Sequence, residues 1–283
     1  MGVFRSPCNC VKLAVVLLVL PLAACASNRL TRDVAQQQQV AQTQTQAEQK
    51  NNIASLSEVI KTNPTDANAL NLRGTAYGQA GDYERALADF NAALSANPQF
   101  PQAYANRALV FVRMKRLQEA LADYDRAINI DPNYATAYVG RGNIHRLAKN
   151  HPLAIADFSR ALEIEANPVA YFNRGLSRQA VNEHAQAIDD FDNALGFRAD
   201  APEVYQAKGI SELALRKYEN AADNFYKAAQ GSKNNYEAWA LRGQATEAMG
   251  QMQEAAKAYQ RALQINPSFQ PARQGLERTG RAA

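Results

Sequence analysis

The sequence predicts an all-α protein, a right-handed solenoid of six helical hairpins closed by a C-terminal capping helix. Two observations support this prediction. Small and aromatic residues recur with a period of about 34 residues from Leu70 to Trp239, and self-similarity at such a period is typical of stacked helical units. The chain of 283 residues, 47% of them hydrophobic, can also bury the continuous core that such a stack requires.

Residues 1–24 are predicted to form a signal peptide. Arg5 and Lys12 precede an apolar stretch at 13–24. As a helix this stretch is too short to cross a bilayer core of about 30 Å, and its length is typical of the apolar core of an export signal. We therefore expect the body of the protein to be exported.

Residues 22–25, LAAC, resemble the lipobox of bacterial lipoprotein precursors, in which cleavage precedes a cysteine that is then lipidated. The resemblance implies a lipid anchor on Cys25. In that family the following residue influences sorting, and Ala26 favours the outer membrane, with the body in the periplasm. An ordinary secretory signal that ends in Ala-Ala-Cys is the alternative interpretation.

Residues 25–52 are predicted to be a tether and residues 53–66 an N-terminal capping helix. Eight of the fourteen residues at 36–49 are glutamine, and so polar a stretch buries too little surface to offset its ordering entropy. Apolar residues also recur weakly at intervals of seven residues here. The alternative is therefore a helical or self-associating segment, and with it a homodimer. After residue 53 the apolar residues follow helical spacing until Asn63-Pro64.

Residues 67–269 carry six copies of the repeat. In the first copy Leu70 is followed by Gly74, then by Ala86, Phe90 and Ala93. The equivalent aromatic residues of the later copies are Tyr124, Phe158, Phe191, Phe225 and Tyr259. Small residues at these positions let two antiparallel helices approach closely, and the ring fills the space beside them. The pattern resembles the tetratricopeptide repeat, which implies a solenoid whose concave face is lined by first helices and holds peptides. Residues 270–283 are expected to form a C-terminal helix that shields the last repeat.

A basic residue stands at one position of every copy, where the family usually has leucine. This basic row consists of Arg73, Arg107, Arg141, Arg174, Lys208 and Arg242. In the first four copies an aspartate follows at one constant offset, which places it on the facing helix: Asp89, Asp123, Asp157 and Asp190. An arginine at a helix interface is tolerated when it is paired, so we expect structural ion pairs, with ligand binding as the alternative. Asn224 and Ala258 replace the aspartate in copies five and six, which predicts that Lys208 and Arg242 are free cations.

Several classes of function are disfavoured. The three histidines, His145, His151 and His184, fall on packing positions of the repeat, and no nucleophile signature, phosphate loop or metal-spaced cluster accompanies them. We therefore expect no enzyme, no cofactor and no metal. The net charge of +4 is small for a protein that binds nucleic acid through its phosphates.

The resemblance to the tetratricopeptide family also implies candidate peptide-binding residues on the first helices. Carried over by position, these are Asn71, Asn106, Arg113, Asn143, Arg146, Phe172, Asn173, Gln206 and Gln244, together with the expected free cation Arg242. Asparagine and glutamine both donate to and accept from a peptide backbone, which suits sequence-tolerant capture. A merely solvated polar face is the alternative.

A lipid anchor followed by these repeats resembles the NlpI-type outer-membrane lipoproteins. The resemblance implies a periplasmic scaffold or adaptor that binds protein or peptide clients, in the organisation of the cell envelope or of peptidoglycan enzymes. The alternative is an assembly lipoprotein for a pilus or secretin, of the PilF and TadD type. The two hypotheses differ in the client and share the architecture.

Overall fold

The computed structural model describes residues 47–48 and 50–282. The predicted signal peptide, Cys25 and most of the predicted tether lie outside these residues. By their contacts the chain divides into two units, Met1–Ala54 and Ser55–Ala283, and the fold below is that of the second. No helix in the described ranges combines the length and apolarity needed to cross a membrane.

Within the described part of the chain every regular element is a helix, so the all-α prediction is confirmed. Residues 50–62 are helical. This helix therefore begins before residue 53, the residue at which the capping helix was expected to begin. The helices that follow are α2 (Ala67–Gln79), α3 (Tyr83–Ala96), α4 (Pro101–Arg113), α5 (Leu117–Ile130), α6 (Ala135–Leu147), α7 (His151–Ile164), α8 (Pro168–Ala180), α9 (His184–Phe197), α10 (Pro202–Ala214), α11 (Tyr218–Gly231), α12 (Tyr236–Ala248), α13 (Met252–Ile265) and α14 (Gln270–Ala282).

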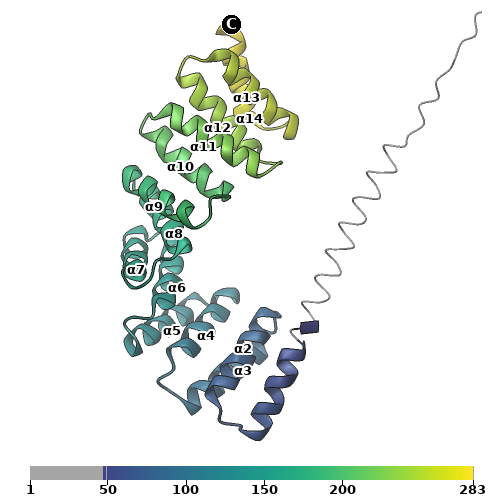
Figure 1. Cartoon of the computed structure of the whole chain (residues 1–283), viewed down its shortest axis with the longest axis vertical. Helices are drawn as coiled ribbons and strands as arrows, with labels where there is room; N and C mark the ends of the chain where they lie inside the picture. Colours follow the sequence, from purple (N-terminus) through teal and green to yellow (C-terminus); the bar gives the residue numbers. More distant parts are fainter. Residues whose placement is uncertain (1–46, 49, 283) are drawn as a thin grey trace, which may run out of the picture. The chain divides into compact units, whose positions relative to one another are not determined.

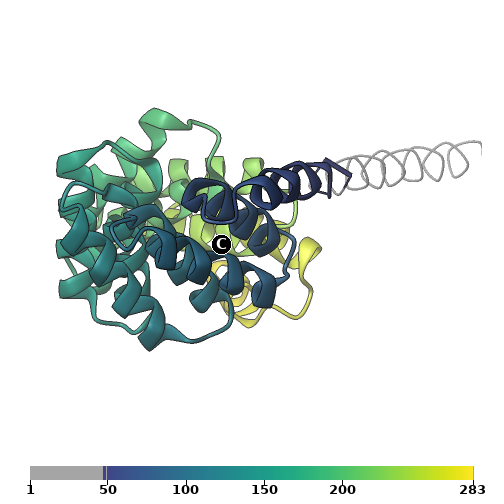
Figure 2. The same ribbon diagram turned by 90° about the horizontal axis from the view of Figure 1, so that it is seen from below.

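Helices α2 to α13 form the six expected hairpins, and α14 packs against α13 and α12 as the expected C-terminal cap. The second helix of each hairpin also packs against the first helix of the next, so the hairpins follow one another along a curved stack (Figure 1). Seen from below, the helices wind along a superhelical path (Figure 2). At the other end of the stack, Ile60 packs against the cluster that contains Leu70 and Leu94.

The recurrent small and aromatic residues have the role that was predicted for them. The Phe90, Phe158, Phe191 and Phe225 rings are at most 1% exposed. A Cβ added to Gly175 would lie 2.6 Å from the Phe191 ring, and one added to Gly74 would lie 2.9 Å from the Phe90 ring. Real Cβ atoms do not approach so closely, so a helix bearing a larger residue there could not lie at its present distance from its partner.

Each hairpin turns at one residue whose φ is positive. These residues are Gly81, Lys115, Lys149, Asn182, Arg216 and Gly250. They stand at the same position of the six copies, although glycine, which adopts this conformation at least cost, occupies it in the first and last copies alone. The regular turn therefore comes from the packing of the two helices rather than from a glycine in every copy.

Candidate functional site

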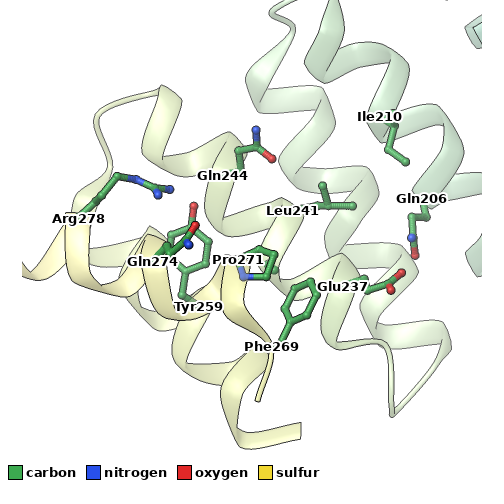
Figure 3. Close-up of a pocket in the computed structure, with 11 residues that line it drawn as sticks. Gln206, Ile210, Glu237, Leu241, Gln244, Tyr259, Phe269, Pro271, Gln274 and Arg278 are labelled. Atoms are coloured by element: carbon green, nitrogen blue, oxygen red, sulfur yellow. The ribbon is translucent and has the colours of Figure 1, made fainter. Parts of the chain in front are cut away.

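A cavity opens between the first helices α10 and α12 and the capping helix α14. Its volume is about 450 Å³. Consecutive first helices contact each other along most of the stack, but this contact is weakest between α10 and α12, so a space remains at that point. Figure 3 shows the lining residues, with Ile210 and Gln206 on one side, Arg278 and Tyr259 on the other, and Leu241 between them.

Helical spacing brings the cavity-lining side chains to one face of each helix. Gln206 and Ile210 are one turn apart on α10, and Glu237, Leu241 and Gln244 follow each other at intervals of four and three residues on α12. The end of the chain supplies the remaining wall with Phe269, Pro271, Gln274 and Arg278. The capping helix is thus part of the cavity as well as a cover for the last repeat.

An ion pair and a hydrogen bond hold this wall in place. Arg278 Nε and Nη2 donate to the two carboxylate oxygens of Glu247 at 2.7 and 2.9 Å, and the Tyr259 hydroxyl donates to Glu247 Oε2 at 2.6 Å. The hydrogen bonds from Arg278 lower the pKa of the Glu247 carboxyl, and burial raises the pKa of the Tyr259 hydroxyl. At neutral pH the carboxylate is therefore charged and tied to α14, and the phenol remains a neutral donor.

The lining of the cavity combines apolar side chains with amide groups. Ile210, Leu241 and Phe269 supply apolar surface. The side-chain oxygen Oε1 of Gln206 accepts a hydrogen bond from Asn235 Nδ2 at 2.8 Å, which leaves the side-chain NH₂ of Gln206 available. The Gln244 side chain is exposed. Such a surface can take an apolar side chain while amides bind the adjoining peptide backbone. The described ranges contain no group of three or more His, Cys, Asp or Glu side chains placed to hold a metal.

The predicted binding residues do not lie together in the structure. Gln206 and Gln244 line the cavity. Asn106 and Arg113 line a second, smaller cavity of about 130 Å³ between α2 and α4, and Phe172 lines a third of about 180 Å³ beside α8 and α10. The others line none of these three: Asn71, Asn143, Arg146, Asn173 and Arg242.

Four of the predicted asparagines bind each other across neighbouring repeats. Asn106 Nδ2 donates to Asn71 Oδ1 at 3.0 Å, and Asn173 Nδ2 donates to Asn143 Oδ1 at 3.0 Å. Asn71 and Asn173 are also buried. Part of their hydrogen-bonding capacity therefore joins one first helix to the next, which the repeat spacing alone could not reveal.

The predicted ion pairs of the basic row are confirmed in the first four repeats. Arg73, Arg107, Arg141 and Arg174 each bind the aspartate of their own hairpin through two guanidinium nitrogens. The third nitrogen reaches back to the helix that precedes its hairpin, which is the helix at 50–62, α3, α5 and α7 in turn. There it binds Ser57, Asn91, Asp125 and Ser159, respectively. Each of these arginines therefore connects two successive units of the stack.

The expectation that Lys208 is a free cation is wrong. Its Nζ pairs with Asp192 on α9 at 2.5 Å and lies 4.0 Å from Glu212 on its own helix. Glu212 takes the place of the missing aspartate: it is 3% exposed and accepts a hydrogen bond from Asn224 Nδ2 at 2.7 Å. Burial raises the pKa of the Glu212 carboxyl. A carboxylate from a different position thus maintains the basic row in repeat five.

His184 lies closer to a serine than the sequence indicated. Its Nδ1 is 3.4 Å from Ser211 Oγ. The Ser211 side chain is fully buried and also accepts a hydrogen bond from Gln179 Nε2 at 2.8 Å. No substrate can reach that hydroxyl without opening the core, so this serine and histidine form a packing contact between α9 and α10.

The repeat positions did not indicate that the C-terminal segment contributes to the cavity. Phe269, Pro271, Gln274 and Arg278 lie beyond the last first helix, and the family resemblance carried candidates over from first helices alone. A signal was present in Phe269 and Pro271, which place an aromatic and a rigid residue directly before a terminal amphipathic helix. That signal predicts a packed cap but not a cavity beneath it.

Comparison with known proteins agrees with this architecture at two levels. Residues 71–135 and 236–269 match models of the tetratricopeptide repeat. These two segments therefore carry tetratricopeptide repeats, and the other hairpins have the same helical fold. Proteins with such repeats bind protein or peptide partners. A search of curated proteins found no match.

Solved structures share the fold. The tetratricopeptide-repeat protein YrrB, described as having an unusual peptide-binding site, is 21% identical, with a TM-score of 0.63 over 66% of this chain and 97% of its own. PilF of Pseudomonas aeruginosa is also 21% identical, with a TM-score of 0.64 over 75% of this chain and 97% of its own. PilW, described as a type IV pilus biogenesis factor, is 18% identical, with a TM-score of 0.62 over 74% and 98%.

Proposed function

We propose that this protein is a lipid-anchored adaptor of the cell envelope that binds an extended segment of a client protein in the cavity between α10, α12 and α14. The observation that carries the proposal is the cavity itself, whose lining combines apolar side chains with glutamine amides. It accepts a side-chain anchor without demanding one sequence, as an adaptor with several clients requires. Two clients on one solenoid would raise each other's effective concentration.

The client site can be tested by placing a charge in the cavity. Ile210→Asp should reduce capture of clients from an envelope extract by at least about tenfold, because a carboxylate in the cavity lining would lose its hydration when a client anchor enters. The measurement is a pull-down with the immobilised protein, with captured proteins quantified by mass spectrometry. Ile210 is 37% exposed, so the substitution leaves the core intact.

Leu153→Asp is the matched control. Leu153 is 49% exposed and lies on α7, the second helix of its hairpin, away from the residues that line the cavity. The control should capture the same clients as the unchanged protein. If both variants retain the clients, or both lose them, the cavity is not the binding site.

The lipid anchor rests on the sequence at residues 22–25 and on the resemblance to lipoprotein precursors. We expect Cys25→Ser to move the protein from the membrane fraction to the soluble fraction, because a hydroxyl cannot form the thioether that attaches the diacylglycerol. Two or three acyl chains hold a protein stably, and none remain in the variant. Fractionation of cells followed by immunoblotting measures the change, and tight membrane association of the variant would contradict the anchor.

The scaffold we favour organises cell-wall enzymes from the periplasmic face of the outer membrane. An assembly factor for a pilus or secretin is the second candidate, and it is favoured by the likeness of fold to PilF and PilW over about three quarters of this chain. The pull-down distinguishes the two. Cell-wall hydrolases or a protease, lost in Ile210→Asp, would support the scaffold, whereas a secretin or pilus subunit would support the assembly factor.

A further inference from the structure

Arg242, the last member of the basic row, occupies the same place in its repeat as the paired arginines. Its Cζ lies 5.6 Å from the centre of the Trp239 ring. The equivalent distances are 5.5 Å from Arg107 to Tyr104 and 5.7 Å from Arg174 to Tyr171. Arg242 Cζ therefore lies as far from the aromatic ring of its own helix as the Cζ atoms of these paired arginines do.

The two side chains that bind the other cations of the basic row, one on each neighbouring second helix, are both replaced around Arg242. Ala258 stands where the first four repeats have an aspartate, and Tyr226 stands where the preceding units have Ser57, Asn91, Asp125, Ser159 and Asp192. Tyr226 offers the face of its ring, 4.4 Å from Arg242 Cζ. Among the described residues the guanidinium of Arg242 has no ion-pair or hydrogen-bond partner, and its backbone carbonyl accepts from Thr246 Oγ1 at 3.0 Å. Glu254 on α13 interacts with it through charge alone and is paired with Lys257 at 2.7 Å.

We propose that Arg242 binds a carboxylate of an acidic segment of a partner protein, at the junction of α11, α12 and α13. The ligand class follows from the row itself, because a carboxylate accompanies the cation in each of the other five repeats. Tyr226 and Trp239, in edge-to-face contact at 5.8 Å, fix the guanidinium by cation–π contact and leave its N–H groups for the ligand.

This site is separate from the cavity of the proposed function. Arg242, Tyr226 and Trp239 do not line the cavity, and Tyr226 is 39% exposed. A client held in the cavity and an acidic segment held at Arg242 could bind at the same time. A failure of the client-site test would therefore leave the assignment of Arg242 unchanged.

Trp239 is the single tryptophan of the chain and reports directly on this site. Tryptophan fluorescence of the full-length protein is titrated with a blocked hexapeptide of glutamate and, separately, with one of glutamine. We expect a saturable change with the glutamate peptide and none with the glutamine peptide over the same concentrations. Equal responses to the two peptides, or no saturable response, would overturn the proposal. Inorganic phosphate that saturates the response at a lower concentration than the glutamate peptide would also overturn it, in favour of a general anion site.

Ala258→Asp restores the internal carboxylate of the row and should weaken binding of the glutamate peptide by at least about tenfold, since the introduced group competes for the same guanidinium. Gln260→Glu, on an exposed position of the same helix, adds the same charge and should bind like the unchanged protein. If Ala258→Asp does not fold, Arg242→Gln serves instead and should abolish the response. Wild-type affinity in Ala258→Asp or in Arg242→Gln would contradict the assignment.

Discussion

Asp123→Ala is expected to lower the free energy of unfolding by about 3 kcal/mol, because it leaves a partly buried arginine without its carboxylate. The Asp123 side chain is 2% exposed and accepts hydrogen bonds from Arg107 Nε at 2.7 Å and Nη2 at 2.8 Å. It also accepts one from Arg126 Nη1 at 3.0 Å. The substitution therefore removes three charge-assisted hydrogen bonds at once. Urea unfolding followed by circular dichroism measures the loss.

Asp125→Ala is the control on the same helix. Asp125 pairs with Arg141 Nη1 at 2.7 Å, but its side chain is 52% exposed, and exposed pairs contribute at most about 1 kcal/mol. We expect a loss of about 0.5 kcal/mol. Equal losses for the two variants would mean that burial does not set the strength of the row, and no loss for Asp123→Ala would return the basic row to ligand binding.

Gly140→Ala is expected to destabilise the protein by about 2 kcal/mol, although alanine is the better helix former. An added Cβ would overlap the Tyr124 ring and lie 2.5 Å from its hydroxyl oxygen. Tyr124 is 4% exposed and belongs to the core shared by repeats two and three, so its ring cannot swing into solvent. Thermal unfolding of the variant measures the effect.

Gly196→Ala is the matched control for this prediction. Gly196 also lies in a helix, α9, but nothing lies within 4 Å of its added Cβ. This change should stabilise the protein by about 0.5–1 kcal/mol through helix propensity. A double substitution, Gly140→Ala with Tyr124→Leu, should cost less than the sum of its parts because the ring is gone. Additive costs would show that the overlap is not the cause.

Much of the fold follows from local patterns. The regular recurrence of small and aromatic positions placed all six hairpins, because each hairpin buries its small residues against one aromatic ring and does so in the same way each time. The constant offset between arginine and aspartate likewise predicted the pairs of Arg73, Arg107, Arg141 and Arg174, because two helices joined by a fixed turn keep a fixed register. The pairing of Lys208 was not predicted, because its carboxylates come from other positions: Asp192 on the preceding helix at 2.5 Å and Glu212 on its own helix at 4.0 Å.

The site could be predicted less well. Gln206 and Gln244 were placed on the inner helices by their repeat position, and both line the cavity. Asn71 and Asn173 occupy first-helix positions too, yet they face neighbouring amides across the repeat boundary. Position within a repeat indicates the helix on which a side chain lies. It does not indicate whether that side chain forms hydrogen bonds to the next repeat or remains available to a ligand.

The amino-acid sequence by itself determined the helical class, the number of hairpins and the ion pairs within the first four of them, since all of these depend on spacings inside one repeat. The tertiary structure decided where a cavity remains. That outcome depends on how closely α12 lies to α10 and on the position of α14, which the ion pair between Glu247 and Arg278 holds. Packing between repeats is a sum of many small contacts over distant parts of the chain, and no local pattern encodes it.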